Sequence, residues 1–149
     1  YRLSIAGKGE VAYTGDLKRR SQGLPVDFLG FVSLPEFFKT VDILLVPSWE
    51  EPFGIVLLEA MASGIPVVST AVGGPLDIVR AGRDGVLISP HDPRSLATEI
   101  RRPAADSAFR TNIVTSARQR VESEFDIHKV IPRIEVFYQG LLGANVVPS

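Results

Sequence analysis

Short apolar runs alternate with longer segments of helical character through the first two thirds of the chain, and this alternation most constrains its fold. Runs such as residues 43–47 are almost continuously apolar, which is typical of strands that are covered on both faces. Strands that alternate with helices form right-handed β-α-β units around a parallel sheet. We therefore predict an α/β protein with a doubly wound, Rossmann-like sheet of about five or six parallel strands.

The predicted strands are bounded by Gly, Pro, Asp or Ser and cover residues 2–6, 26–29, 43–47, 67–70 and 86–88. The predicted helices cover residues 12–22, 34–40, 53–63, 75–81 and 93–101. Two C-terminal helices are expected, one at 107–124 with an apolar stripe from Phe109 to Val121, and one after Asp126 with Pro132 near its first turn. These elements predict one domain over residues 1–142 and a frayed tail over residues 143–149.

Composition narrows the function classes. The formal net charge of −1 gives no general attraction to nucleic acid, and no apolar run approaches the roughly 20 residues of a membrane span. The absence of cysteine excludes disulfides, thiolate metal sites and cysteine nucleophiles. Because the chain opens directly in a strand-like segment without a signal-peptide pattern, we expect it to be a fragment of a longer protein.

The stretch from Ser48 to Thr70 carries most of the functional information. Its turn Glu51-Pro52-Phe53-Gly54 follows a predicted strand, and ligands of open parallel sheets bind beyond the carboxyl ends of strands. We expect a helix that begins near Pro52 to present free N–H groups to an anionic ligand such as a diphosphate. Gly54 would allow that ligand to approach the backbone closely.

Two carboxylates, Glu51 and Glu59, are eight residues apart. On a regular helix this spacing corresponds to about 12 Å of rise and an offset of about 80°. Glu59 lies in the apolar run 55–62 and is predicted to be largely buried, where a carboxylate needs partners. A solvated helix face is the simpler interpretation of a lone Glu, but the pair favours binding to the hydroxyls of an elongated ligand.

This stretch resembles the retaining GT-B glycosyltransferases of family 4, also called glycosyl transferases group 1. Glu51 and Glu59 match their E-x7-E motif, and the words around it, EPFG and EAMASGIPVV, are close to the usual wording of the family. Further matches are Gly7-Lys8-Gly9, Phe28 to Val32, Gly73-Gly74, Asp84-Gly85 and Pro90-His91-Asp92. The resemblance spans roughly residues 1–142 and implies the C-terminal, nucleotide-sugar-binding domain of such an enzyme.

The resemblance implies a catalytic position for Glu51, which would hold hydroxyls of the donor sugar, and a contact between Glu59 and the ribose hydroxyls. It implies further donor contacts by Phe53, Gly54 and Ile55 at the sugar and diphosphate, by Phe31 and Val32 at the base, and by Gly7 and Gly9 at the crevice wall. The family usually has Glu where this chain has Asp77, which we interpret as local structure.

The implied activity of the full-length protein is that of a retaining hexosyltransferase (EC 2.4 class) in polysaccharide biosynthesis. It would move a hexosyl group from a UDP-, GDP- or ADP-sugar to a saccharide or lipid-linked acceptor, with no cofactor or metal. The family takes its acceptor site from an N-terminal domain, and its diphosphate-binding Arg and Lys precede the opening strand. We therefore expect the isolated chain to be inactive, and the full-length protein to be cytoplasmic, with peripheral contact to the inner membrane surface only through that N-terminal domain.

Two other functions remain open. Residues 7–12 satisfy the loose G-x-G-x-x-A fingerprint of NAD-binding domains, but the candidate acid, Asp27, precedes the apolar part of its strand. A non-catalytic interaction domain is the second alternative. Five further residues have purely structural interpretations: Asp92 as a helix cap, His91 and His128 as a loop and a helix-end histidine, and Phe37 and Phe38 as core. The sequence leaves Trp49 open between a carbohydrate-stacking surface and the core.

Overall fold

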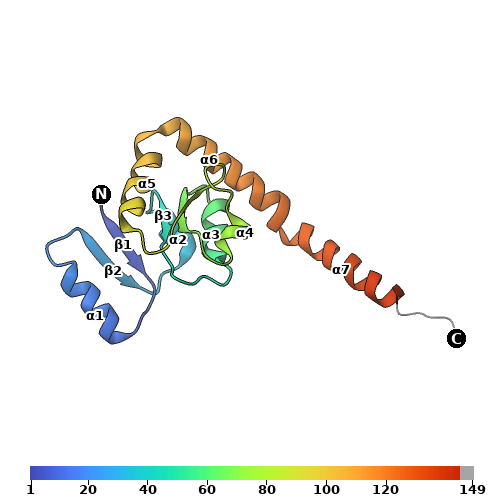
Figure 1. Ribbon diagram of the computed structural model, residues 1–149, viewed down its shortest axis with the longest axis horizontal. Helices are drawn as coiled ribbons and strands as arrows, with labels where there is room; N and C mark the ends of the chain where they lie inside the picture. Colours follow the sequence, from blue (N-terminus) through green and yellow to red (C-terminus); the bar gives the residue numbers. More distant parts are fainter. Residues whose placement is uncertain (145–149) are drawn as a thin grey trace. The chain divides into compact units, whose positions relative to one another are not determined.

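The computed structural model describes residues 1–144, with side chains through residue 142. The chain divides into two compact units, Tyr1–Thr40 and a second unit that begins at Val41, and each is described by itself (Figure 1). The five strands run parallel within their sheets, as the alternating pattern predicts. They pair as a two-stranded sheet in the first unit and a three-stranded sheet in the second, and the predicted α/β class with about five parallel strands is confirmed.

The first unit is a single β-α-β arrangement followed by a short helix. Its elements are β1 (Leu3–Ala6), α1 (Val11–Arg20), β2 (Val26–Gly30) and α2 (Leu34–Phe38). Asp27 on β2 is engaged by Arg2, whose Nη2 donates to Asp27 Oδ1 at 2.9 Å. This hydrogen bond holds the pKa of the Asp27 carboxyl below its ordinary value. Because the acid is already paired with Arg2, it is poorly placed to serve a dinucleotide ribose.

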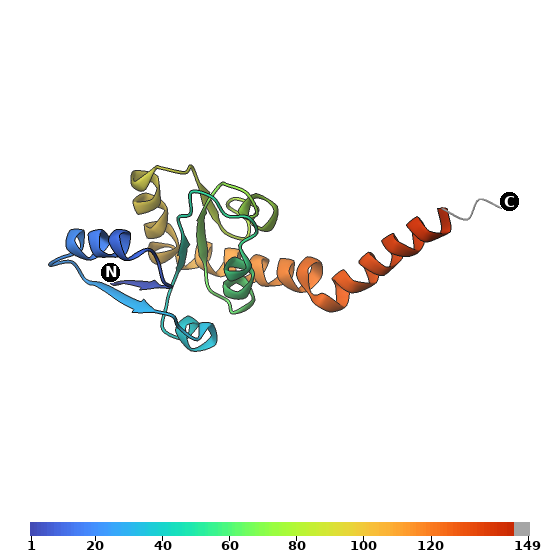
Figure 2. The same cartoon turned by 90° about the horizontal axis from the view of Figure 1, so that it is seen from below.

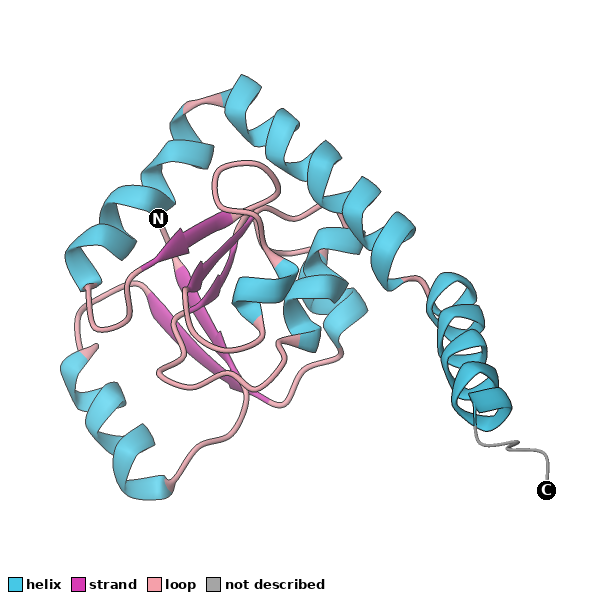
Figure 3. Cartoon of the chain, turned by 45° about the vertical axis from the view of Figure 1, so that its right-hand side comes forward, coloured by secondary structure: helices cyan, strands magenta, loops and turns pink. Residues whose placement is uncertain are grey.

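The second unit is built on a three-stranded sheet with the order β3 (Leu44–Val46), β4 (Val67–Thr70) and β5 (Val86–Ile88), drawn in magenta in Figure 3. All four residues of the central strand β4 are buried, as expected for a parallel strand that is covered on both faces. Val68 lies opposite Val86 in the ladder and forms a core cluster with it, against which side chains of the two helices after β5 pack. The predicted bounds of β4 and β5 are confirmed.

Helices follow each strand of this unit. They are α3 (Ile55–Ala62), α4 (Pro75–Ile78), α5 (Pro93–Ala105), α6 (Ser107–Arg120), a π-helical turn (Val121–Phe125) and α7 (Ile127–Ala144). The predicted stripe on α6 is confirmed, because Ile113 and Ala117 are buried and Phe109 and Val121 are half-buried. α5 runs past the predicted end at residue 101, through the buried Pro103.

The last helix begins directly after Asp126, as predicted, and extends beyond residue 142. α7, the orange-to-red helix of Figure 2, begins at Ile127. It contains Pro132 in its second turn, where the ring nitrogen cannot donate to the carbonyl of His128. Pro132 therefore lies just beyond the first turn, near which it was predicted. Gly143 and Ala144 belong to α7, and the other residues of the predicted frayed tail, 145–149, lie outside the described residues. Among residues 1–144, no helix is both long enough and apolar enough to cross a membrane.

The buried hydroxyl of Thr70 ties the end of β4 to the segment after β3, and its removal should be measurable. Its Oγ1 donates to Ser48 O at 2.6 Å. Thr70→Val keeps the shape but leaves this part-buried carbonyl without its donor, so we expect a loss of about 1–3 kcal/mol in the free energy of unfolding by urea titration. The matched control is Thr98→Val. The exposed hydroxyl of Thr98 donates to Arg94 O on α5, so its removal should lower the free energy of unfolding by only about 0.5 kcal/mol. Equal losses in the two variants would contradict this role for Thr70.

Candidate functional site

Side chains at the end of β4 anchor the segment that joins β3 to α3 by hydrogen bonds. Ser69 Oγ donates to Val46 O at 3.2 Å, and Thr70 Oγ1 donates to Ser48 O. Both hydroxyl side chains are buried, so their hydrogen bonds are made away from competing water. They fix the backbone of residues 46–48 and thereby the starting point of the turn that carries Glu51.

The helix starts at Ile55, two residues after the predicted first residue 53 and three residues after Pro52. Gly54, with φ 96° and ψ 45°, takes a left-handed conformation and precedes Ile55, the first residue of α3. Pro52 is therefore in the turn and not in the helix, and the expected start near Pro52 is wrong. A side chain at position 54 would suffer this backbone strain and would also place its Cβ 3.1 Å from Leu57 Cδ1, so the position requires glycine.

The start of α3 offers backbone donors that have no partner in the described part of the chain. The first hydrogen bond of the helix runs from Leu57 N to Gly54 O at 2.9 Å, and no side chain caps this end. The N–H groups of Gly54, Ile55 and Val56 make no hydrogen bond within residues 1–144. Together with the positive end of the helix dipole, such free donors form an anion-binding position.

A double glycine after β4 packs directly against the turn. Gly74 N donates to Glu51 O at 2.9 Å. A Cβ on Gly73 would overlap the carbonyl oxygen of Glu51, and a Cβ on Gly74 would overlap that of Phe53. The two backbone segments therefore touch without intervening side chains, and this contact fixes the position of the turn relative to the end of β4.

Glu51 lies in this turn, before the helix. Its side chain is half-buried, and its Oε2 accepts a hydrogen bond from Ser48 Oγ at 3.3 Å. The 12 Å rise estimated for a shared helix does not apply to Glu51 and Glu59, because only Glu59 is helical. The second oxygen of the Glu51 carboxylate accepts no hydrogen bond in the described part of the chain, so it can accept one from a ligand hydroxyl.

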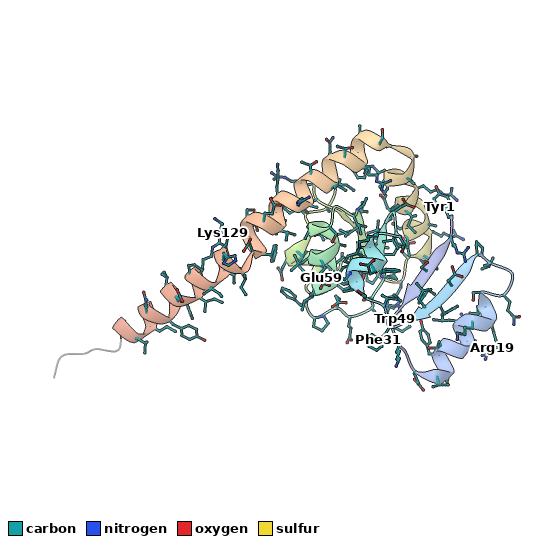
Figure 4. All side chains as sticks on the ribbon, turned by 180° about the vertical axis from the view of Figure 1, so that it is seen from behind. Tyr1, Arg19, Phe31, Trp49, Glu59 and Lys129 are labelled. Atoms are coloured by element: carbon teal, nitrogen blue, oxygen red, sulfur yellow. The ribbon has the colours of Figure 1, made fainter. Side chains whose placement is uncertain are left out.

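Glu59 lies on α3, and its predicted burial is wrong (Figure 4). The buried residues of α3 are Leu57, Ala60 and Met61, whereas Glu59 falls on the exposed side between them. The carboxylate is therefore solvated and needs no internal partner. It is accessible to a ligand, but burial no longer supports a binding role.

The predicted site residues of the first unit gather after its two strands. Gly7, with φ 117°, follows β1 and donates its N–H to Gly30 O at 2.7 Å. Phe31 follows β2 with 79% of its surface exposed, and Lys8 Nζ lies 5.3 Å from the centre of its ring. Gly9 is in the same loop as Lys8, and Val32, next to Phe31, is half-buried. The structure thus brings these residues together within the first unit and Glu51, Phe53, Gly54, Ile55 and Glu59 together within the second.

Several residues outside the candidate site have the structural roles that the sequence predicts. Asp92 caps α5, since its Oδ1 accepts from Ser95 N at 2.9 Å, as predicted. Asp77 lies in the first turn of α4 and its carbonyl accepts from Arg120 Nη2, which fits local structure. Phe38 is buried in agreement with the core interpretation, whereas Trp49 is 67% exposed and does not belong to the core. Among the residues described, no group of three or more acidic or histidine side chains could hold a metal ion.

The architecture is that of the C-terminal domain of a GT-B glycosyltransferase. Sucrose-phosphate synthase from Thermosynechococcus elongatus superposes with a TM-score of 0.84 at 30% identity, over 97% of this chain and 39% of that one. The Anabaena protein HepE, solved in complex with UDP-glucose, superposes with a TM-score of 0.83 at 28% identity, over 93% of this chain and 41% of that one.

Sequence comparison gives the family. Residues 1–106 match the family model described as Glycosyl transferases group 1. An uncharacterized glycosyltransferase of Methanocaldococcus jannaschii is 40% identical over 129 residues, which are 83% of this chain and 33% of that protein. The chain therefore belongs to the glycosyl transferases group 1 family, and it spans about a third of the length of that relative.

Three features of the site were missed from the sequence. The hydrogen bond from Ser48 to Glu51 is local and depends on the shape of the turn. Thr70 as the anchor of the turn and the backbone contact of Gly73-Gly74 join segments that are brought together only by the fold. The double glycine did carry a signal, because two adjacent glycines after a buried strand indicate that another backbone approaches closely.

The double glycine gives a sharp test of the packed turn. Gly73→Ala should destabilise the protein far more than Gly82→Ala, because both positions have positive φ but only position 73 lacks room for a Cβ. We expect a loss of about 1–2 kcal/mol for Gly82→Ala from backbone strain, and a further loss of several kcal/mol, or failure to fold, for Gly73→Ala. Thermal and urea unfolding of the two variants provide the measurement. Similar losses would show that the turn can move away from the glycines.

Proposed function

We propose that this chain forms the donor-binding part of a retaining hexosyltransferase. The full-length enzyme would transfer a hexosyl group from a UDP-, GDP- or ADP-sugar to a saccharide or lipid-linked acceptor. The observation that carries the proposal is the turn of residues 51–54, in which a half-buried carboxylate lies beside unpaired N–H groups at the start of α3.

Each part of this turn suits one part of a nucleotide sugar. The free N–H groups of Gly54, Ile55 and Val56 would donate to the diphosphate, whose negative charge the positive helix end stabilises. The exposed side chains of Phe53 and Ile55 flank this position and would contact the donor. Glu51 would accept hydrogen bonds from sugar hydroxyls, with Ser48 holding one of its oxygens.

Transfer with retention would proceed on one face of the sugar. The acceptor oxygen forms a bond to the anomeric carbon as the bond between that carbon and the diphosphate breaks, and the departing phosphate oxygen takes the proton of the acceptor hydroxyl. In this scheme Glu51 positions the sugar and forms no covalent bond to it. Stabilisation of the leaving diphosphate is the main electrostatic requirement, and the N–H groups of α3 supply part of it without a metal ion.

Known relatives support this proposal. HepE, whose fold matches over 93% of this chain, has been solved with UDP-glucose. We expect the remaining cations and the acceptor site to come from an N-terminal domain of the full-length, cytoplasmic protein. Isolated, this chain would then bind a donor nucleotide without transferring its sugar. The base-reading positions Phe31 and Val32 and the loop glycines Gly7 and Gly9 remain predictions for the same donor.

The proposed contact between Glu59 and the ribose can be tested by comparing a ligand that contains a ribose with one that does not. Glu59→Gln should weaken binding of whichever of UDP, GDP or ADP the chain prefers by about three- to tenfold, because a charge-assisted hydrogen bond to the ribose is lost. Binding of inorganic pyrophosphate, which has no ribose, should not change. Calorimetric titration of the chain measures both, and Glu50→Gln, an exposed acid next to Glu51, is the control. The assignment would be contradicted if Glu59→Gln weakened the nucleotide and pyrophosphate equally. It would also be contradicted if the chain bound NAD but none of UDP, GDP and ADP.

Glu51 can be tested by the affinity that the sugar adds. In the unchanged protein the nucleotide sugar should bind more tightly than the nucleotide alone. Glu51→Gln should remove most of that difference while leaving nucleotide affinity within about twofold, since the lost interactions are with sugar hydroxyls. Glu50→Gln should keep the difference. If Glu51→Gln weakened the nucleotide and its sugar conjugate equally, the acid would be supporting the turn and not the sugar.

A further inference from the structure

A small pocket of about 160 Å³ lies beyond the carboxyl ends of β3, β4 and β5, within the second unit. Pro47, Thr70 and Ile88 stand where the three strands end, and Trp49 and His91 also line the pocket. Ligand pockets for drug-sized molecules usually measure roughly 300–1,000 Å³, so this one has room for a single ring and not for a whole nucleotide sugar.

The lining of the pocket combines the aromatic ring of Trp49 with the apolar side chains of Ile88 and Leu96. The Trp49 and His91 rings lie 5.2 Å apart between centroids at an interplanar angle of 44°. Trp49 is the only tryptophan of the chain and is two-thirds exposed, so one part of its indole is supported by the imidazole and much of the rest faces solvent. Ile88 and Leu96 contribute the apolar surface. An exposed indole over an apolar floor suits a ligand with one apolar face.

The polar groups of the pocket suit hydroxyls and not phosphates. No Lys or Arg is among the residues that line it. Asp92 contributes a carboxylate whose Oδ1 is held by Ser95 N, while Oδ2 accepts no hydrogen bond in the described part of the chain. At the start of α5, Pro93 has no N–H and the N–H of Ser95 is already bound to Asp92, so only the N–H of Arg94 is left among the first three residues for an anion. A neutral ligand with hydroxyl groups fits this charge pattern.

The backbone at His91 is also unusual. Its φ of 59° is the only positive value at a residue other than glycine in the described chain. The left-handed conformation is unfavourable for a branched or bulky side chain, although histidine tolerates it better than most residues. It sets His91 against Trp49, immediately before the capping Asp92. Strained residues of this kind cluster at binding and active sites.

We propose that this pocket binds one pyranose ring of a neutral saccharide, with a sugar face on Trp49 and a hydroxyl donating to Asp92 Oδ2. The site is separate from the proposed donor position at the start of α3 and goes beyond the donor-binding function. Through this pocket, this part of the enzyme would bind a saccharide chain directly.

The single tryptophan makes the test direct. The chain is titrated with neutral trisaccharides of glucose, mannose, galactose and N-acetylglucosamine while the fluorescence of Trp49 is recorded. We expect at least one of them to produce a saturable change with a Kd on the order of millimolar, as for a small ligand on one stacking surface. Inorganic phosphate should produce none, and saturating UDP should leave the saccharide Kd unchanged.

Variants assign the binding to the pocket. By calorimetry, Trp49→Ala should weaken the saccharide about tenfold or more. Asp92→Asn, which keeps a good helix-capping residue, should weaken it about threefold or more. Phe137→Ala, which removes an exposed aromatic side chain of α7, is the matched control and should have no effect. UDP affinity should be unchanged in all three, so failure of the donor site and failure of this pocket give different results.

The proposal is overturned if no trisaccharide changes the fluorescence at tens of millimolar, or if Trp49→Ala binds as well as the unchanged protein. It is equally overturned if phosphate or UDP competes with the saccharide, because the pocket would then belong to an anion site.

Discussion

The contact between two stretches of bare backbone organises the second unit of this protein. The carbonyls of Glu51 and Phe53 lie against Gly73 and Gly74 so closely that no Cβ can stand between them. Because the double glycine follows the buried strand β4 after only two residues, its contact holds the turn close to the end of the sheet. The hydroxyls of Ser69 and Thr70 brace the beginning of the same turn from the end of that strand. The position of Glu51 and the direction of the N–H groups of α3 both follow from these short-range contacts.

Sequence patterns predicted the strands well and the site only in part. β4 and β5 have their predicted bounds because a short buried strand is marked by its own composition and by the Gly, Pro and Ser at its ends. The start of α3 was placed too early because Pro52 is a good first helical residue, whereas the left-handed Gly54 is what ends the turn. Glu59 was predicted to be buried because its neighbours are apolar, yet a helix has a free side even in an apolar run. Contacts between segments that are distant in sequence, such as Ser48 with Thr70, depend on how the strands are ordered.

The two candidate sites of the second unit divide the ends of its strands between opposite chemistries. One side offers amide donors to a negative charge, and the other offers an aromatic ring and a carboxylate without any cation. A single loop serves both, since Trp49 and Glu51 are two residues apart. Such a division would keep a charged donor and a neutral saccharide from competing for the same surface.

The N–H donors at the start of α3 belong to the main chain, whereas the side chains of Phe53 and Ile55 beside them are exposed. Substitution at these two positions would change the shape and polarity around a bound molecule and leave the anion contacts intact. Under the proposed function, substitutions at these surface positions alone would change the choice of sugar, whereas Gly73 and Gly74 tolerate almost no substitution because no Cβ fits there.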